Sequence, residues 1–447
     1  MASTSINRAF SSSSTNTKAT WSFWIKRNKI GVEQWVFQSR DANNNNYRTY
    51  IRFASNDQID MRIYNTNATL VGQLQTNRVF RDTNAWYHIV YRLDNSHGNA
   101  GDRLRLYING VEETSFATDT QMAQGQQVRL VSSGHTAWGR NAPNNEVFLD
   151  ACLSHVHFLE GEDRDASYFG ETDTTTGEWK IKTSPTGINY GTNGYFILKD
   201  GNSLTDQSPN SNNFSLVGGT LTKTEDNPSN VFATGNIIDE GCDSHPVFSN
   251  GNNSYSVGSA VWRFALSTLG MSSGKFYMEQ KRGSGGNYFA GVTDQHDNLN
   301  RDLTTNKYAG GEPLGVGYYS DNGNKYLNNN STSFGNSYAN GDIVGTAIDV
   351  DNGYVYFSKN GVWQNSGDPT SGSSGTGGIA LPTSSNATGV WFFCPSLYNG
   401  TLDVNYGNGY FGTTAVSSAG TNASGIGIFE YDVPTGYTAL STKGLNE

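Results

Sequence analysis

The chain has little cysteine, little proline and no long apolar run. Its 447 residues include three cysteines and ten prolines. Cys152, Cys242 and Cys394 stand far apart and none belongs to a Cys-x-x-Cys motif, so we expect buried thiols rather than disulfides or a metal site. No apolar stretch approaches the ~18 residues of a membrane-spanning helix, so we expect no membrane insertion. The opening residues, MASTSINRAFSSSSTNTK, lack the apolar centre of a secretory signal.

Positive charge is also scarce. Thirty Lys and Arg residues stand against forty Asp and Glu residues, which gives a formal net charge of −10. Phosphate binding requires a basic surface, so nucleic acid is not an expected partner. Nucleophile and phosphate-loop motifs are missing as well, because the chain has no G-x-S-x-G and no glycine loop followed by Lys-Ser/Thr. We interpret the glycine-rich residues 283–286 as a flexible hairpin tip.

Aromatic residues and glycine are abundant. The chain has 9 Trp, 24 Tyr, 22 Phe and 52 Gly. Aromatic rings need burial or a partner, so this composition is not that of a disordered chain. Glycine, together with abundant asparagine and serine, supplies turns between many short strands. Since the length exceeds what one core usually organises, we expect two or three β domains.

Two hairpins of one design recur far apart in the chain. In residues 104–108 leucine and isoleucine alternate with polar residues, which is the period of a half-buried strand, and Asn109-Gly110 follows at once. Asn-Gly favours the type I′ turn that joins two antiparallel strands. The alternation weakens beyond Val111, so we expect the second strand near a sheet edge. Residues 354–363 repeat this pattern around Asn360-Gly361.

A set of strand motifs in the first third of the chain carries a family resemblance. They are WSFWIK at 21–26, WYHIV at 86–90, LYINGV at 106–111, WGR at 138–140 and SHVHF at 154–158. Together they resemble the concanavalin-A-like jelly roll of the laminin-G type. The resemblance implies two antiparallel sheets packed face to face over residues 1–170.

The second half of the chain resembles a SPRY domain. The motifs are GDIVG at 341–345, FSKNGV at 357–362, and VNYG at 404–407 followed by Phe411. The resemblance implies a bent β-sandwich that binds partners through loops at one end. We therefore predict an all-β protein with two antiparallel β-sandwich domains. They cover residues 1–170 and 236–447, and an extended, partly β connecting segment over residues 171–235 joins them.

The order of the two modules, with the ending at residues 433–443, resembles a group of tailed-phage virion proteins. That resemblance implies a non-enzymatic structural or adhesive component of the virion surface. We expect a capsid decoration or a compact subunit of a tail appendage, in multiple copies or as a homo-oligomer. Its partners would be other virion proteins and host-surface glycans. The alternatives are a virion-associated glycan-degrading enzyme, a receptor-binding tail fibre protein, and a cellular SPRY adaptor that recognises peptides.

The enzyme alternative needs two carboxylates on one concave face, about 5 to 10 Å apart. The closest pair is Glu160 and Glu162, which we interpret as an acidic surface turn because they follow a strand beside a glycine. Glu112 and Glu113 are adjacent, so in an extended chain they point to opposite faces. We therefore predict that the protein is not an enzyme.

Metal binding has two weak candidates. His155 and His157 share a strand face, as zinc ligands can, but no third ligand follows at a matching spacing, and we interpret both, with His88, as structural. Oxygen donors that suit calcium cluster in one loop. These calcium candidates are Asp294, Asp297, Asn298, Asn300 and Asp302. A solvated loop is the favoured interpretation, so we expect no cofactor, with calcium as the alternative.

Glycan binding needs an aromatic ring for the apolar face of a sugar, and amide or carboxylate groups for its hydroxyls. Several places in the loops offer this mixture. The candidates are Tyr47, Tyr318 and Tyr319 near Asp321, and Trp363 with Gln364.

Overall fold

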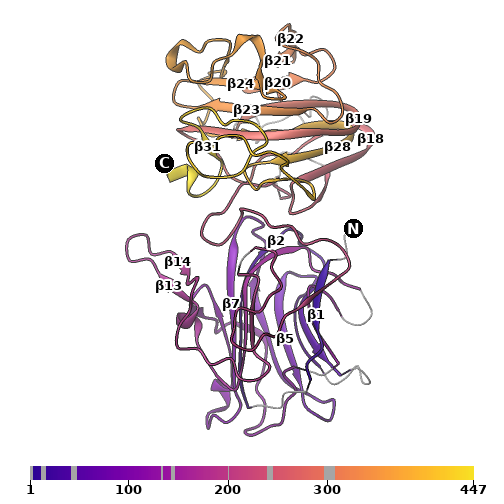
Figure 1. The fold of residues 1–447 in the computed structure, drawn as a ribbon, viewed down its shortest axis with the longest axis vertical. Helices are drawn as coiled ribbons and strands as arrows, with labels where there is room; N and C mark the ends of the chain where they lie inside the picture. The colour runs from indigo at the N-terminus through magenta and orange to yellow at the C-terminus, as the bar shows by residue number, and fades with distance from the viewer. Residues whose placement is uncertain are drawn as a thin grey trace. The chain divides into compact units, whose positions relative to one another are not determined.

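The computed structural model describes residues 4–11, 17–41, 48–131, 134–141, 146–199, 201–238, 245–295 and 308–446. All elements named below lie in these residues. The chain forms two compact units, Met1–Lys223 and Thr224–Glu447. The regular secondary structure of each unit is almost entirely β-strand, which confirms the predicted all-β class (Figure 1). No helix in the described ranges is long and apolar enough to cross a membrane.

The first unit contains an eight-stranded antiparallel sheet with the order β10-β6-β5-β4-β3-β11-β1-β16. Its strands are β1 (Ser5–Arg8), β3 (Gln34–Arg40), β4 (Arg48–Phe53), β5 (Gln58–Tyr64), β6 (Leu70–Val79), β10 (Phe116–Thr120), β11 (His135–Trp138) and β16 (Ser215–Val217).

The second sheet of this unit has the order β15-β12-β2-β7-β8-β9 and is also antiparallel. Its strands are β2 (Lys18–Arg27), β7 (Trp86–Asp94), β8 (Leu104–Ile108), β9 (Val111–Glu112), β12 (Ala151–Glu160) and β15 (Tyr195–Ile197). Alternate residues of both sheets meet in one apolar core, with Trp21 and Phe23 from one sheet packed on Phe37 and Trp138 from the other. This face-to-face packing is the predicted sandwich.

The first predicted hairpin is present. Asn109 has φ 48° and Gly110 has φ 80°, which are values of a type I′ turn, and the turn joins β8 to β9. β9 ends its sheet and Val111 is 68% exposed, so the predicted edge position is confirmed. A β-carbon at Gly110 would lie 2.4 Å from the Trp179 ring, so only glycine fits there.

The polar residues 171–223 belong to the first unit. β15 and β16 extend its two sheets by pairing with β12 and β1. β13 (Gly170–Thr172) and β14 (Trp179–Ile181) form a separate two-stranded ribbon that projects from the side of the unit (Figure 1). The part of the predicted connecting segment up to Lys223 therefore contributes strands to both sheets of the first unit.

The second unit is organised around one strand, β19 (Lys275–Asp294), which pairs with β20, β23, β27, β28 and β31. The other strands of this sheet are β17 (Val247–Ser249), β18 (Ser254–Phe264), β20 (Gly315–Tyr319), β21 (Lys325–Leu327), β22 (Asn330–Thr332), β23 (Ile343–Asp349), β24 (Tyr354–Lys359), β25 (Val362–Trp363), β26 (Ile379–Ala380), β27 (Trp391–Phe393), β28 (Ser396–Asn405) and β31 (Thr438–Ala439). A small ribbon joins β29 (Tyr410–Phe411) to β30 (Thr414–Ala415). The predicted hairpin at Asn360-Gly361 joins β24 to β25, with φ 48° and 80°.

The interpretation of residues 283–286 as a hairpin tip is wrong. They lie inside β19, which runs straight through them and pairs with β28 on both sides of a register shift between Arg282 and Gly285. The glycines are required by close backbone approach, since a β-carbon at Gly285 would lie 2.3 Å from the Asn399 carbonyl oxygen. Glycine here marks a β-bulge, not a chain reversal.

Candidate functional site: an aromatic platform in the second unit

Alternation along β19 separates two sets of aromatic side chains. Tyr288 belongs to the main core of the second unit, and the neighbouring Phe289 belongs to a separate cluster on the other face of the sheet. The same division holds on β20, where Tyr318 lies in the main core and Tyr319 in the separate cluster. Adjacent strands bring Phe289 directly opposite Tyr319.

Phe289 is the centre of this second cluster, which we call the aromatic platform. Its ring is 2% exposed and stacks between Tyr308 and Tyr319, with centroid distances of 4.7 Å to each. Tyr326 packs edge-on at 5.0 Å and Trp262 is tilted at 5.1 Å. The half-exposed rings of the platform are Trp262, Tyr308, Tyr319, Tyr326 and Tyr398.

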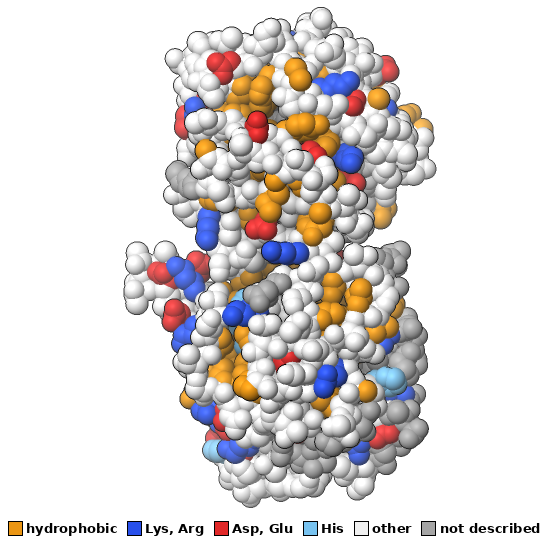
Figure 2. Space-filling model, viewed as in Figure 1, with side chains coloured by type: hydrophobic (Ala, Val, Ile, Leu, Met, Phe, Trp, Pro, Cys, Tyr) orange, Lys and Arg blue, Asp and Glu red, His pale blue; other side chains and the backbone are white. Residues whose placement is uncertain are grey.

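Polar groups border these rings. The Tyr308 hydroxyl donates to Asn329 Oδ1 at 2.5 Å, and Asn329 is exposed. Asp321 is exposed beyond the end of β20, and after burial its charge is the next cause that raises the pKa of Tyr319. Both tyrosines therefore stay neutral hydroxyl donors at ordinary pH, because burial also raises the pKa of Tyr308. Apolar side chains reach the surface of the second unit in separate patches between polar ones (Figure 2).

Comparison with known families follows the division into two units. Residues 3–167 match the concanavalin A-like lectin/glucanases superfamily, and residues 258–378 match the SPRY domain. The chain contains a concanavalin A-like domain and a SPRY domain. The aromatic platform combines residues of the SPRY match with Tyr398, which lies beyond it.

Three similar solved structures each cover less than half of the chain. The SPRY domain of human HERC1 is 16% identical and covers 36% of this chain and 91% of its own, with a TM-score of 0.26. The TRIM65 PSpry domain is 16% identical, covering 39% and 91%, with a TM-score of 0.27. A heptameric SAP-like pentraxin from Limulus polyphemus is 14% identical, covering 49% and 90%, with a TM-score of 0.29. No curated protein matches the chain.

The predicted glycan candidates Tyr318 and Tyr319 lie on opposite faces of the sheet, and only one of these faces carries the platform. Tyr319 lies in the platform and Asp321 is exposed beside it. Tyr318 cannot contact a sugar, because its ring is fully buried in the main core and its hydroxyl donates to the Asn336 carbonyl oxygen. Tyr47 lies outside the described residues.

The second predicted pair, Trp363 with Gln364, packs and forms hydrogen bonds within the second unit. Trp363 is half-buried and packs edge-on against Tyr277 at 6.4 Å. Gln364 is 5% exposed, accepts from the Asn336 amide at 2.9 Å and donates to the Val362 carbonyl at 2.8 Å. Both contribute to the packing of the loop after the second hairpin. Trp363 is partly exposed like the rings of the platform, and a glycan role for this pair stays a prediction.

Of the calcium candidates, the structure describes only Asp294. Its carboxylate accepts from the Thr388 amide and hydroxyl at 3.1 and 3.0 Å, and from the Gly389 amide at 2.9 Å. It thus holds the loop before β27. Asp297, Asn298, Asn300 and Asp302 lie outside the described residues. In the described ranges no group of three or more His, Cys, Asp or Glu side chains is arranged to hold a metal ion.

Three histidines of the first unit, His88, His155 and His157, are packed among rings. His157 is 1% exposed, stacks on Phe196 at 3.9 Å and lies 2.9 Å from the Tyr190 hydroxyl, while His155 packs on the same Phe196 at 5.6 Å. Burial lowers the pKa of His157, and that of the fully buried His88 to about 3. Neutral, ring-packed imidazoles fit the predicted structural role.

The thiols and the acidic pair depart in part from expectation. Cys394 is buried as predicted, Cys152 is only half-buried, and Cys242 lies outside the described residues. Glu160 is not on the surface, because its carboxylate is 7% exposed and accepts from the Asn193 amide and side chain at 2.8 and 3.1 Å. Glu162 pairs with Arg164 at 2.7 Å. The two carboxylates have separate structural partners.

Four rings of the platform were missed from the sequence: Trp262, Tyr308, Tyr326 and Tyr398. The doublet Tyr318-Tyr319 was the available signal, since in a strand two adjacent rings must point to opposite faces. Which ring faces the core depends on the partner layer, and the sequence does not specify that layer.

Proposed function

We propose that the protein is a non-enzymatic, glycan-binding adhesive component of a virion surface. The observation that carries the glycan-binding part is the aromatic platform. Four half-exposed rings pack on the buried Phe289, namely Trp262, Tyr308, Tyr319 and Tyr326, and Tyr398 packs on Trp262. Sugars stack their apolar faces on such rings, and the hydroxyls at the edge bond to amides and carboxylates. Asn329 and Asp321 supply those groups at the rim.

The arrangement favours binding over hydrolysis. A glycosidase requires a facing pair of carboxylates. Two described carboxylates act on the platform, but on different rings, because the charge of Asp321 acts on Tyr319 and that of Glu312 acts on Tyr308. Glu160 and Glu162 of the first unit are engaged by Asn193 and Arg164. The matched families, a lectin-containing superfamily and SPRY, fit the same binding role.

The virion setting rests on the order of the two modules and the closing residues 433–443. Mass spectrometry of purified tailed-phage particles that carry this gene tests it through the copy number. We expect the chain to be present, in hundreds of copies for a capsid decoration or in about six to twelve for a tail appendage, as closed symmetry requires. A chain missing from intact particles would exclude the virion setting and leave the glycan site to be tested by itself.

Affinity electrophoresis through gels that contain dextran, mannan or galactan tests the platform. The double variant Tyr319→Ala/Tyr326→Ala should lose retention by about tenfold or more, since each ring contributes about 0.5–1.5 kcal/mol. Tyr354→Ala is the matched control, because Tyr354 is also a half-buried tyrosine of the second unit but lies outside the platform. Equal retention of the double variant and the wild type would exclude the platform as the sugar site.

A further inference from the structure

The outward face of the eight-stranded sheet carries a row of cationic side chains. Core residues such as Ile51 and Phe53 alternate with the residues of that face on β4, so Arg48 and Arg52 point away from the sandwich interior with Tyr50 between them. β5 contributes Arg62 to the same face, since it pairs opposite Tyr50. In a chain with a net charge of −10, this local excess of arginine requires an explanation.

Two of these arginines are neutralised within the face. Asp60 is fully buried, and its Oδ2 accepts from Arg52 Nε at 3.1 Å and from Arg62 Nε at 3.0 Å. Its Oδ1 accepts from Gln73 at 2.9 Å, and Glu33 contacts Arg52 at 3.0 Å. These contacts neutralise the positive charge of Arg52 and Arg62 at one end of the face.

The other end brings like charges together. In the strand register, His135 lies opposite Arg40, and Arg40 lies opposite Arg48. Like charges directly opposite each other destabilise a sheet. After burial, the charge of Arg48 is the next cause that lowers the pKa of Arg40, and the charge of Arg40 likewise lowers the pKa of His135. Arg40 and Arg48 are therefore close enough to repel each other, whereas the lowered pKa of His135 keeps its imidazole neutral at ordinary pH.

Arg48 is held in place without a carboxylate. Its guanidinium lies over Tyr50 at 5.2 Å and over Tyr64 at 5.3 Å. Its Nε is buried and has no hydrogen-bond partner, and no ion pair of Arg48 is found in the described ranges of the chain. The preceding residues 42–47 have the sequence ANNNNY and contain no acidic side chain.

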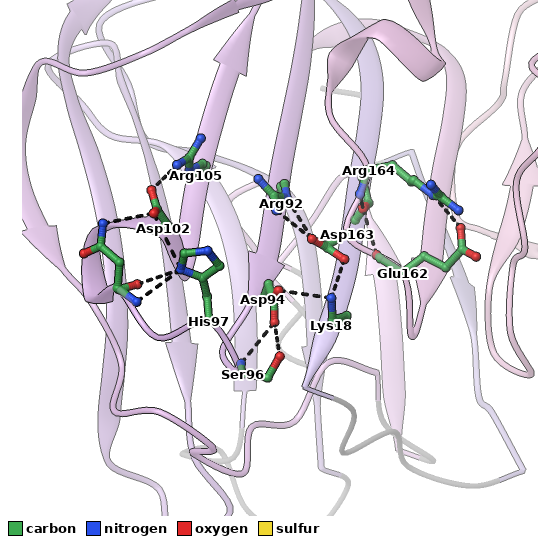
Figure 3. A network of polar contacts seen from close by, with 12 residues as sticks. Lys18, Arg92, Asp94, Ser96, His97, Asp102, Arg105, Glu162, Asp163 and Arg164 are labelled. Carbon is green, nitrogen blue, oxygen red and sulfur yellow. Dashed lines mark hydrogen bonds and ion pairs between the residues drawn. The ribbon is translucent and has the colours of Figure 1, made fainter.

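The six-stranded sheet shows that this chain can balance its outward charges. There Lys18 lies between Asp94 and Asp163, Arg92 contacts Asp163, and Arg164 contacts Glu162 (Figure 3). Each cation has at least one carboxylate within 3.0 Å. On the other sheet the charge of Asp41 acts on Arg40, whereas no ion pair of Arg48 is found in the described ranges, so Arg48 is the cation that an external anion would satisfy.

We propose that Arg48, on the outward face of the eight-stranded sheet, binds the carboxylate of an acidic saccharide. A guanidinium presents parallel N–H donors that match a carboxylate, and Tyr64 beside it offers a ring to the sugar. The amides of Gln73 and Gln75 on the neighbouring β6 donate to Asp60 and Gln58 at 2.9 and 2.7 Å, so the recognition rests on Arg48 and Tyr64. This inference extends the proposed glycan binding to a second site of different chemistry, and it rests on that function.

The test is biolayer interferometry of the full chain against immobilised polygalacturonate, with dextran as the neutral polymer and oligo-dT as a polyanion without carboxylates. We expect binding to polygalacturonate that weakens as NaCl is raised, because an exposed ion pair is screened by salt. Arg48→Gln should weaken it by about tenfold or more, and Arg48→Lys by less, because lysine keeps the charge but loses the paired donors.

Arg78→Gln is the matched control. Arg78 is an exposed arginine near the end of β6 that pairs with Glu113 at 2.9 Å, so its loss removes the same charge from the same unit. Polygalacturonate binding should be unchanged in Arg78→Gln, and retention on dextran should be unchanged in Arg48→Gln, which keeps failure of this site distinct from failure of the platform. Equal polygalacturonate binding by Arg48→Gln and the wild type, or tighter binding to oligo-dT than to polygalacturonate, would overturn the proposal.

Discussion

The two outward faces of the first unit differ in whether their charged side chains are paired within the protein. On the six-stranded sheet, Asp163 accepts from Lys18 at 2.8 Å and from Arg92 at 2.6 Å, and the network is satisfied within the protein (Figure 3). On the eight-stranded sheet, Asp60 serves two arginines and Arg48 is left facing Arg40. A sheet can thus stabilise itself with its surface charges or leave one of them for a ligand.

The largest effect should come from removing the carboxylate that the eight-stranded face does possess. Asp60→Asn leaves Arg52 and Arg62 without their shared buried partner. Breaking a buried ion pair costs about 3–5 kcal/mol, so the free energy of unfolding should fall by that amount. Urea denaturation of the full chain measures it, and a loss below about 1 kcal/mol would mean that Asp60 is not the anchor of this face.

The next largest effect on the free energy of unfolding comes from a buried carboxylate in the second unit, and this effect depends on pH. Glu279 accepts from the Glu430 and Tyr431 amides at 2.8 Å each, and burial raises its pKa from 4.5 to about 7. The folded state therefore binds a proton that the unfolded state has released over this range. Stability from this group is full below about pH 4.5 and is lost as pH rises to about 7, by about 3 kcal/mol.

Urea midpoints at about pH 5 and about pH 8 measure this loss, with Glu279→Gln as the comparison. The variant should lack the contribution of this group, so its pH dependence should be flatter than that of the wild type. Parallel profiles for the two proteins would show that Glu279 is ionised throughout the range.

A smaller loss is expected on the six-stranded face. Asp163→Asn weakens contacts with Lys18 and Arg92, which are partly exposed, so we expect about 1–2 kcal/mol. Burial raises the pKa of Asp163, but the bonds from Lys18 and Arg92 outweigh it and hold the pKa below 3.8. The wild-type contribution is therefore present above about pH 4 and lost as pH falls below it, and acid titration of unfolding should show this only in the wild type.

The smallest effect on stability should come from Arg48. Arg48→Leu removes the repulsion with Arg40 and keeps an apolar contact on Tyr50, so the free energy of unfolding should stay equal or rise by about 0.5 kcal/mol. Thermal denaturation measures this change. A loss comparable to that of Asp163→Asn would assign Arg48 a structural role and would make the two faces alike.

Local patterns predicted much of the fold. Alternation in residues 104–108 and the Asn-Gly pairs identified both hairpins, because these signals depend only on neighbours in sequence. The bulge at Gly285 was missed because a glycine run in a strand and in a turn look the same without the partner strand. Sites were harder to predict. The row of His135, Arg40 and Arg48 joins residues from three strands, and nothing local indicates their register.

The central claim is that both domains bind glycans and cleave none. Incubation of the full chain with a panel of dextran, mannan, galactan and polygalacturonate tests it most directly when retention and new reducing ends are measured on the same samples. We predict retention on at least one polymer with reducing ends that stay at the level of the protein-free control. Reducing ends that accumulate in proportion to protein concentration, or no retention on any polymer, would contradict the account.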